Sequence, residues 1–154
     1  MFIDGSNRLL YIKWDGVYLP IGCLTGDSFS ESSEMLDTTT RDNAGWKTST
    51  PTTQSYSIDF EGLIKQTLFV GQAETVLTYQ NIKTLKRNRT LIEWKINSGV
   101  DIYVSSGFAH ITSLGDSSNI DEFISFNATL EGYGPITEST RRLNFLQSQL
   151  QTEL

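Results

Sequence analysis

The sequence predicts a mainly β protein, a β-sandwich or barrel with one α-helix and one long extended hairpin loop. Several segments alternate between apolar and polar residues, which is the period of a strand with one buried face. One segment in the middle of the chain has a helical period, and Ser, Thr and Gly are frequent. The length of 154 residues suits one domain with one core.

The first two strands are predicted close to the start of the chain. Residues 9–15 alternate, and the Asp-Gly pair at their end predicts a tight hairpin turn. Residues 17–24 form the second strand, and Pro20 within it predicts an edge strand or a bulge because proline has no backbone donor. Cys23 is the single cysteine, and we expect it to be a small buried apolar residue.

A polar segment and a strongly alternating one follow each other in the next part of the chain. Residues 28–40 extend as a polar strand into an arm of Thr, Asp, Asn and Gly residues that holds one large apolar residue, Trp46. Residues 54–63 then show the clearest alternation of the protein, with Tyr56 among the apolar residues on one face. We expect this last segment to be a strand of the sheet.

The helix is predicted within residues 71–88, at about three turns by usual helix lengths. Strand character returns at residues 90–97, 101–114 and 122–132, which brings the total to about seven strands. We expect the β domain to end at residue 137. The tail that follows, residues 138–154, is expected to be helical or to pack on a neighbouring subunit.

The charge of the chain argues against a nucleic-acid clamp. The formal net charge is −6 at pH 7, whereas phosphate binding needs a basic surface. One cluster of basic residues is present around the predicted helix end: Lys83, Lys86, Arg87, Arg89 and Lys95. We interpret it as a solvated helix end or as a partner for acidic residues of another subunit.

No residue pattern of a catalytic, metal or cofactor site is found. The single histidine, His110, has no nucleophile motif beside it, and one His with one Cys does not make a zinc site. The acidic pair Asp59 and Glu61 lies on one strand face, but alternate residues of most solvated strands are polar. We therefore expect a protein that is not an enzyme and binds no cofactor.

Four groups of residues, taken in order, carry a family resemblance. They are a loop (Asp37, Thr38, Thr39, Asp42, Gly45, Trp46, Lys47), the strand after it (Ser57, Ile58, Gly62), a late strand (Gly107, Ala109, Ile111, Thr112) and a closing strand (Phe126, Ala128, Leu130, Gly132, Gly134). In this order and spacing, the chain from Leu9 to Thr137 resembles the phage major tail protein, or tail tube protein, family of long non-contractile tails. Residues after Thr140 match no feature of that family.

The resemblance implies a protomer that assembles with itself into hexameric rings, which stack into a hollow tube in the virion. DNA passes through the lumen without specific binding. The implied partners are the tape measure protein and the tail terminator and initiator proteins, with assembly in the cytoplasm of the bacterial host and no membrane involved.

Two sets of candidate site residues follow. We expect the arm to make the contact between stacked rings, because its one large apolar residue would serve there as an aromatic anchor. This stacking loop consists of Asp37, Thr38, Thr39, Arg41, Asp42, Trp46 and Lys47.

The second set is expected to face the lumen. The polar faces of two strands carry three acidic residues and no Lys or Arg, which suits a wall along which DNA slides. These residues are Ser57, Asp59, Glu61, Ser125, Asn127, Thr129 and Glu131. The alternative is that they are ordinary solvent-facing strand residues.

Two other functions remain open from the sequence. The inner tube protein of a contractile or secretion-type injection machine would share the fold. A monomeric β-sandwich module that binds carbohydrate belongs to a different class, and it would stay monomeric at all concentrations.

Overall fold

The computed structural model describes residues 4–64, 76–97 and 104–139. The strands are β1 (Leu9–Trp14), β2 (Val17–Pro20), β3 (Leu24–Asp37), β4 (Ser49–Leu63), β5 (Ile92–Asn97), β6 (Val104–Ser117) and β7 (Ser125–Ser139). The helix α1 spans Tyr79–Arg87, and two short 3-10 turns, η1 and η2, lie at Gly5–Asn7 and Arg41–Asn43. The predicted fold class, mainly β with one helix and a long hairpin, is confirmed.

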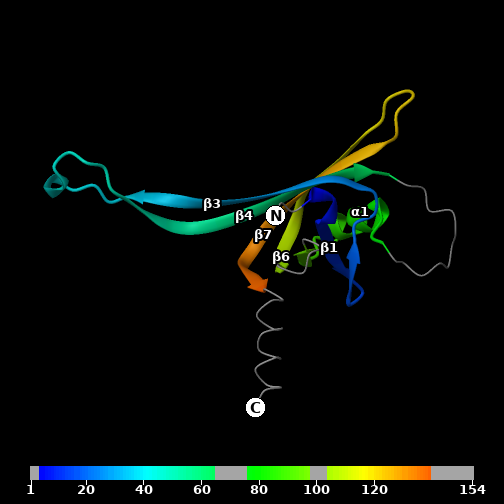
Figure 1. The fold of residues 1–154 in the computed structure, drawn as a ribbon, viewed down its shortest axis with the longest axis horizontal. Coiled ribbons are helices and arrows are strands. Elements are labelled where there is room, and N and C mark those ends of the chain that lie inside the picture. The colour runs from blue at the N-terminus through cyan, green and yellow to red at the C-terminus, as the bar shows by residue number, and fades with distance from the viewer. Residues whose placement is uncertain (1–3, 65–75, 98–103, 140–154) are drawn as a thin grey trace, which may run out of the picture.

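The seven strands form one antiparallel sheet in the order β2-β1-β5-β6-β7-β4-β3 (Figure 1). Three strands separate β5 from β3 in this order, so a flat sheet would hold them about 19 Å apart. The ring centroids of Phe29 on β3 and Trp94 on β5 are nevertheless 6.0 Å apart. The sheet therefore curls strongly, in the manner of a partly closed barrel.

An ion pair joins the edge strand β3 to the start of β1, the second strand from the other edge of the curled sheet. Arg8, which precedes β1, places its Nε 2.8 Å from Oδ2 of Asp27 on β3. Both atoms are shielded from solvent, and neither has a hydrogen bond to another described residue. The pair therefore links two strands that are far apart in the strand order.

The core fills the concave side of the sheet. Every strand except β3 contributes buried apolar side chains, and Trp94 is the largest of those that are almost inaccessible. The helix packs on the same side through Tyr79, Ile82 and Leu85. The rings of Tyr79 and Phe126 lie 5.3 Å apart, which ties the helix to β7.

The helix is shorter than the sequence predicts. It begins at Tyr79, and Thr78 before it has extended backbone angles. Leu77, which lies within the range predicted for the helix, instead pairs in a parallel bridge with Ile21 and donates its N–H to the carbonyl of Pro20. The prediction for residues 71–75 lies outside the described part of the chain.

The N-terminal predictions are confirmed except for Cys23 and the length of the second strand, which ends at Pro20 and not at residue 24. Asp15 and Gly16 have φ angles of 50° and 79°, as a tight hairpin requires, and β2 is an edge strand that ends at Pro20. The expectation that Cys23 is buried is wrong. Its φ of 58° turns the chain from β2 into β3, and its side chain is exposed.

The arm is a β-ribbon for most of its length. β3 pairs with β4 from Leu24 to Asp37, whereas β4 pairs with β7 only between Ser57 and Leu63. The halves of β3 and β4 beyond this point form a two-stranded ribbon that projects from the body (Figure 1). Pro51 is tolerated in β4 because it lies opposite Met35, next to a register shift.

The late strands begin close to their predicted positions. β6 starts at Val104, the first described residue after the gap, and β7 starts at Ser125, so Ile124 lies before the strand and is exposed. The predicted C-terminal tail lies outside the described residues from position 140 onward. In the described part of the chain, no helix has the length and apolar character that crossing a bilayer needs.

Candidate functional site: polar face and arm

The structure brings the seven residues expected at the lumen together on one surface, the polar face. The register of β4 and β7 places Ser57 opposite Glu131, Asp59 opposite Thr129, and Glu61 opposite Asn127. Ser125 completes the set at the start of β7, opposite Leu63. Alternation directs the neighbours of these residues into the core, so the seven polar side chains share the convex side of the sheet.

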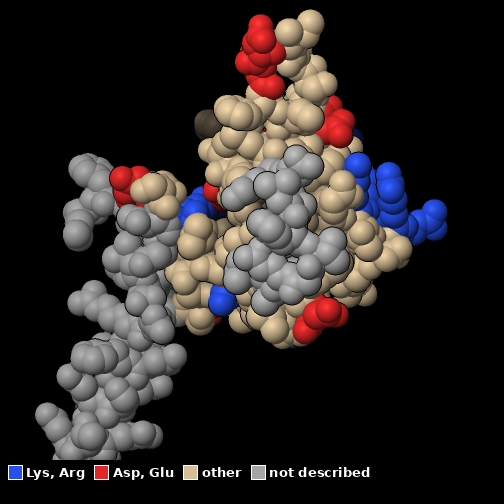
Figure 2. Space-filling model, turned by 90° about the vertical axis from the view of Figure 1, so that its right-hand side faces the viewer, with Lys and Arg blue, Asp and Glu red and all other residues tan. Residues whose placement is uncertain are grey.

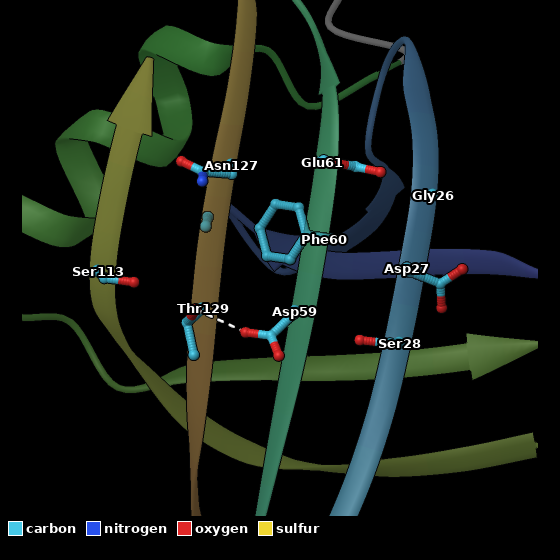
Figure 3. Close-up of a pocket in the computed structure, with 10 residues that line it drawn as sticks. Gly26, Asp27, Ser28, Asp59, Phe60, Glu61, Ser113, Asn127 and Thr129 are labelled. Carbon is cyan, nitrogen blue, oxygen red and sulfur yellow. Dashed lines mark hydrogen bonds between the residues drawn. The ribbon is translucent and has the colours of Figure 1, made fainter. Parts of the chain in front are cut away.

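Hydrogen bonds between strands hold the polar face in place. Thr129 Oγ1 donates to Asp59 Oδ1 at 2.6 Å, as Figure 3 shows. The hydroxyls of Ser57 and Ser30 are 2.9 Å apart on β4 and β3, which extends the same surface toward the sheet edge. The polar face is therefore a pre-formed surface.

An open hollow of about 440 Å³ lies at the centre of the polar face. It is lined by Gly26, Asp27, Ser28, Asp59, Phe60, Glu61, Ser113, Asn127, Ala128 and Thr129, with no Lys or Arg (Figure 3). Asp27 is paired with Arg8, and the other two acids of the lining, Asp59 and Glu61, repel phosphate. Among residues 4–64, 76–97 and 104–139, no three His, Cys, Asp or Glu side chains are grouped as a metal ion would need.

An aromatic cluster adjoins the polar face, and the sequence analysis did not identify it. His110 on β6 lies opposite Glu131, and its ring is 5.9 Å from that of Tyr133. Phe108, directly opposite Tyr133, is also exposed. Alternation in β6 places Phe108 and His110 on the same face, but nothing in the sequence indicates which β7 residues lie beside them.

The basic residues predicted as one cluster separate into two environments. Lys83 lies on the helix, with its Nζ 4.9 Å from the centre of the Tyr79 ring. Lys95 lies on β5, with its Nζ 5.1 Å and 4.8 Å from the centres of the Tyr11 and Tyr18 rings. Figure 2 shows Lys and Arg gathered along one side of the surface that faces the viewer.

Tyr18 belongs to a charged network on β1, β2 and β5. Its hydroxyl donates to Glu93 Oε1 at 2.6 Å, and Lys13 Nζ lies 3.2 Å from Glu93 Oε2. Burial and the neighbouring Glu93 carboxylate raise the pKa of Tyr18 to about 12. The hydrogen bonds from Tyr18 and Lys13 lower the pKa of Glu93.

At the arm tip, some residues of the predicted stacking loop form hydrogen bonds within the loop itself. Asp37 Oδ1 accepts hydrogen bonds from the backbone N–H and the hydroxyl of Thr39, at 2.9 Å and 2.6 Å. These two bonds lower the pKa of Asp37. Thr38 donates its backbone N–H to the Thr48 carbonyl and its hydroxyl to Thr48 Oγ1, so the tip is tied across its base.

The remaining predicted residues of the tip present their side chains to solvent. Arg41, Asp42, Trp46 and Lys47 are exposed, and their side chains form no hydrogen bond or ion pair with the residues that the structure describes. Trp46 is 78% exposed, which is unusual for so large an apolar side chain. Met35 and Leu36, at the end of β3, are exposed as well and enlarge the apolar area of the tip.

A second apolar protrusion lies at the turn between β6 and β7. Ile120 is 93% exposed and Phe123 is 82% exposed. The sequence analysis places Phe123 within the predicted strand of residues 122–132, whereas the structure places it in the turn before β7.

The comparisons with known proteins agree with the fold. The chain belongs to the phage tail tube protein family, whose model matches residues 3–138. It is therefore a structural component of a phage tail. A search of the curated proteins by sequence found no match.

Solved structures share the fold at low sequence identity. The tail of an empty gene transfer agent particle, refined with C6 symmetry, has a TM-score of 0.74 at 17% identity and covers 89% of this chain and 98% of that chain. The SPP1 tail tube has a TM-score of 0.71 at 16% identity, with 90% and 79% covered. A chain of the anti-feeding prophage baseplate has a TM-score of 0.59 at 12% identity, with 86% and 92% covered.

Proposed function

We propose that this chain forms hexameric rings that stack into a hollow tube, through which DNA passes. Family membership supports the tube, and the gene transfer agent tail of the same fold was refined with C6 symmetry. The observation that carries the proposal is the combination of a projecting arm with a pre-formed acidic face on one small domain. The domain includes residues up to Ser139, because β7 pairs with β6 as far as that residue, and the tail beyond it lies outside the described residues.

The arm makes the contact between rings. A two-stranded ribbon has little stability by itself in water, and this ribbon extends beyond the support of β7. Its tip exposes Trp46 together with Met35 and Leu36. Burial of these side chains against the next ring stabilises both the arm and the stack.

The polar face lines the lumen. Its three acids, Asp59, Glu61 and Glu131, repel the phosphates of passing DNA, and the hydrogen bond from Thr129 keeps one of them fixed on the wall. DNA therefore slides without specific binding. Because the role is structural, we propose that the chain has no catalytic activity.

The remaining partners follow from the position of a tube between capsid and tip. The tube encloses the tape measure protein, and the initiator and terminator proteins meet its two ends. Assembly takes place in the cytoplasm of the bacterial host, and the finished tube belongs to the virion.

A second candidate is the inner tube of a contractile or secretion-type injection machine. The similarity in fold to a chain of the anti-feeding prophage baseplate supports this candidate. It uses the same two surfaces and differs in what surrounds the tube.

Negative-stain electron microscopy of the full chain over a range of concentrations tests the proposal. We expect rings or tubes whose top views average with sixfold symmetry, and an increase in light scattering as tubes grow. Analytical ultracentrifugation that shows a monomer at every concentration would contradict the assembly and favour an isolated binding module.

A further inference from the structure

The turn between β6 and β7 is a hydrogen-bonded protrusion, which we call the β6–β7 tip (residues 118–124). The hydroxyls of Ser117 and Ser125 close its base at 2.9 Å. Within the turn, Asn119 Nδ2 donates to Glu122 Oε2 at 2.8 Å, and the backbone N–H of Glu122 donates to the carbonyl of Asn119. The tip therefore holds one shape while it exposes Ile120 and Phe123.

The charge of the β6–β7 tip is acidic. Asp121 and Glu122 lie between its two exposed apolar residues, and residues 118–124 contain no Lys or Arg. Figure 2 shows acidic atoms on the protrusion at the top of the view, away from the basic side chains. A partner for this surface needs an apolar side chain flanked by cations.

The arm tip has this complementary chemistry. Trp46 is its most prominent apolar side chain, and the cations Arg41 and Lys47 lie on either side of it in the loop. One of the two acids in the tip, Asp37, is already occupied by Thr39. The side chains left to meet a partner are therefore mainly apolar and basic.

The two tips lie at opposite ends of the molecule. The ribbon of β3 and β4 extends to one end of the long axis, and the β6–β7 tip projects from the other end (Figure 1). A subunit cannot bring its own tips together across this length. Two different surfaces at opposite ends are what a repeating head-to-tail contact requires.

We propose that the arm tip of one copy binds the β6–β7 tip of a second copy in the adjacent ring. Trp46 packs beside Ile120 and Phe123, and Arg41 and Lys47 approach Asp121 and Glu122. This inference rests on the proposed tube and identifies the surface that receives the arm. It also accounts for two almost fully exposed apolar side chains far from the core.

Site-directed cross-linking tests the contact on the full chain. Since Cys23 is the single cysteine, a Cys23→Ser background allows Thr40→Cys and Ser118→Cys to be joined by a short bismaleimide without side reactions. Both positions leave the residues of the proposed contact intact. The matched control pairs Thr40→Cys with Val17→Cys, which is exposed near the other sheet edge.

We expect a denaturing gel of cross-linked tubes to show a ladder that continues beyond the hexamer, because each copy gives one arm and receives another along the tube. The control pair should give far fewer products. A ladder that stops at the hexamer places the contact within one ring and overturns the inference. If tubes form but the two pairs cross-link equally, the proposed contact is wrong and the proposed tube is still supported. A Cys23→Ser parent that forms no tubes contradicts the proposed function.

A charge exchange gives an independent measurement. Lys47→Glu and Glu122→Lys should each slow tube growth at least several-fold in light scattering, and the double variant should recover most of the rate. Growth that the double variant does not restore, with all three proteins folded by circular dichroism, contradicts the pairing of these two tips.

Discussion

The ring of Tyr56 occupies the space over Gly132 that any side chain at that position would need. A β carbon added to Gly132 would overlap Cε1, Cζ and Cδ1 of this ring. The Tyr56 hydroxyl donates to the carbonyl of Phe108 at 2.5 Å and accepts from Trp94 Nε1 at 3.2 Å. Gly107 also leaves room for the Tyr56 side chain, since a β carbon at Gly107 would lie 2.8 Å from the Tyr56 oxygen. The curl of the sheet is therefore built around one aromatic side chain.

The first prediction is that Gly132→Ala destabilises the domain by roughly 1–3 kcal/mol, as overpacking of a filled core does. Chemical denaturation measures this change. Gly5→Ala is the matched control, because a β carbon at Gly5 meets nothing within 4 Å. In a Tyr56→Leu background the cost of Gly132→Ala should shrink, and an equal cost in both backgrounds would contradict the assigned contact.

Much of the fold could be predicted because alternation reports which side of a strand is buried. Tyr56, Ile58 and Phe60 are all buried, as the pattern of residues 54–63 predicts. Strand pairing could not be predicted in the same way. Asp59 and Thr129 are hydrogen-bonded neighbours across 70 positions of sequence, and no local pattern encodes this register.

The candidate surfaces were predictable to different degrees for the same reason. The polar side of each strand follows from alternation, but the two sides form one surface only because β4 pairs with β7. The arm was recognisable by its composition, whereas its ribbon structure depends on cross-strand pairing that includes Pro51. The exposure of Ile120 and Phe123 follows from how far the β6–β7 hairpin extends past the core, which residue types do not reveal.

The second prediction concerns the pH dependence of the Tyr18–Glu93 pair. The pKa of Tyr18 is raised from 10.0 to about 12, so its contribution to stability is complete below pH 10 and is lost as the pH rises toward 12. The pKa of Glu93 is lowered from 4.5, so its contribution is complete above that pH and is lost as the pH falls through the lower folded value.

Tyrosinate absorbance during an alkaline titration measures this effect for Tyr18, with Tyr18→Phe subtracted to isolate its signal. In Glu93→Gln, the pKa of Tyr18 should move toward 10, because the neighbouring negative charge is gone. Lys13→Met, which leaves the Tyr18–Glu93 hydrogen bond in place, is the control and should keep the pKa raised. If the pKa of Tyr18 is unchanged in Glu93→Gln, burial alone raises it and the Glu93 carboxylate has no effect.

The third prediction is that Trp46→Ala leaves the domain folded but impairs tube growth. Trp46 is 78% exposed in the single chain, so its truncation removes little buried area and should change the free energy of unfolding by less than about 0.5 kcal/mol. At an interface, loss of such an aromatic anchor costs about 2 kcal/mol or more. Denaturation and light scattering measure the two effects separately.

The control for Trp46→Ala is Leu91→Ala, an exposed apolar residue next to β5 and away from the arm. It should leave tube growth close to that of the parent. Equal growth of all three proteins would refute the role of Trp46 in stacking, and a large loss of stability in Trp46→Ala would show that the arm contributes to the fold of the single chain.

The fourth prediction is that charge reversal on the polar face makes the tube retain DNA. Asp59→Lys with Glu131→Lys replaces two acids of each subunit by cations, and sixfold rings multiply this change along the lumen. The result should be DNA binding that weakens steeply with salt, since phosphate contacts release counterions. Glu138→Lys, outside the polar face, is the control at the same strand. Assembled particles should eject DNA slowly and incompletely with the double variant and normally with the control. Ejection at the parent rate in correctly assembled double-variant particles would contradict the proposal that the polar face lines the lumen.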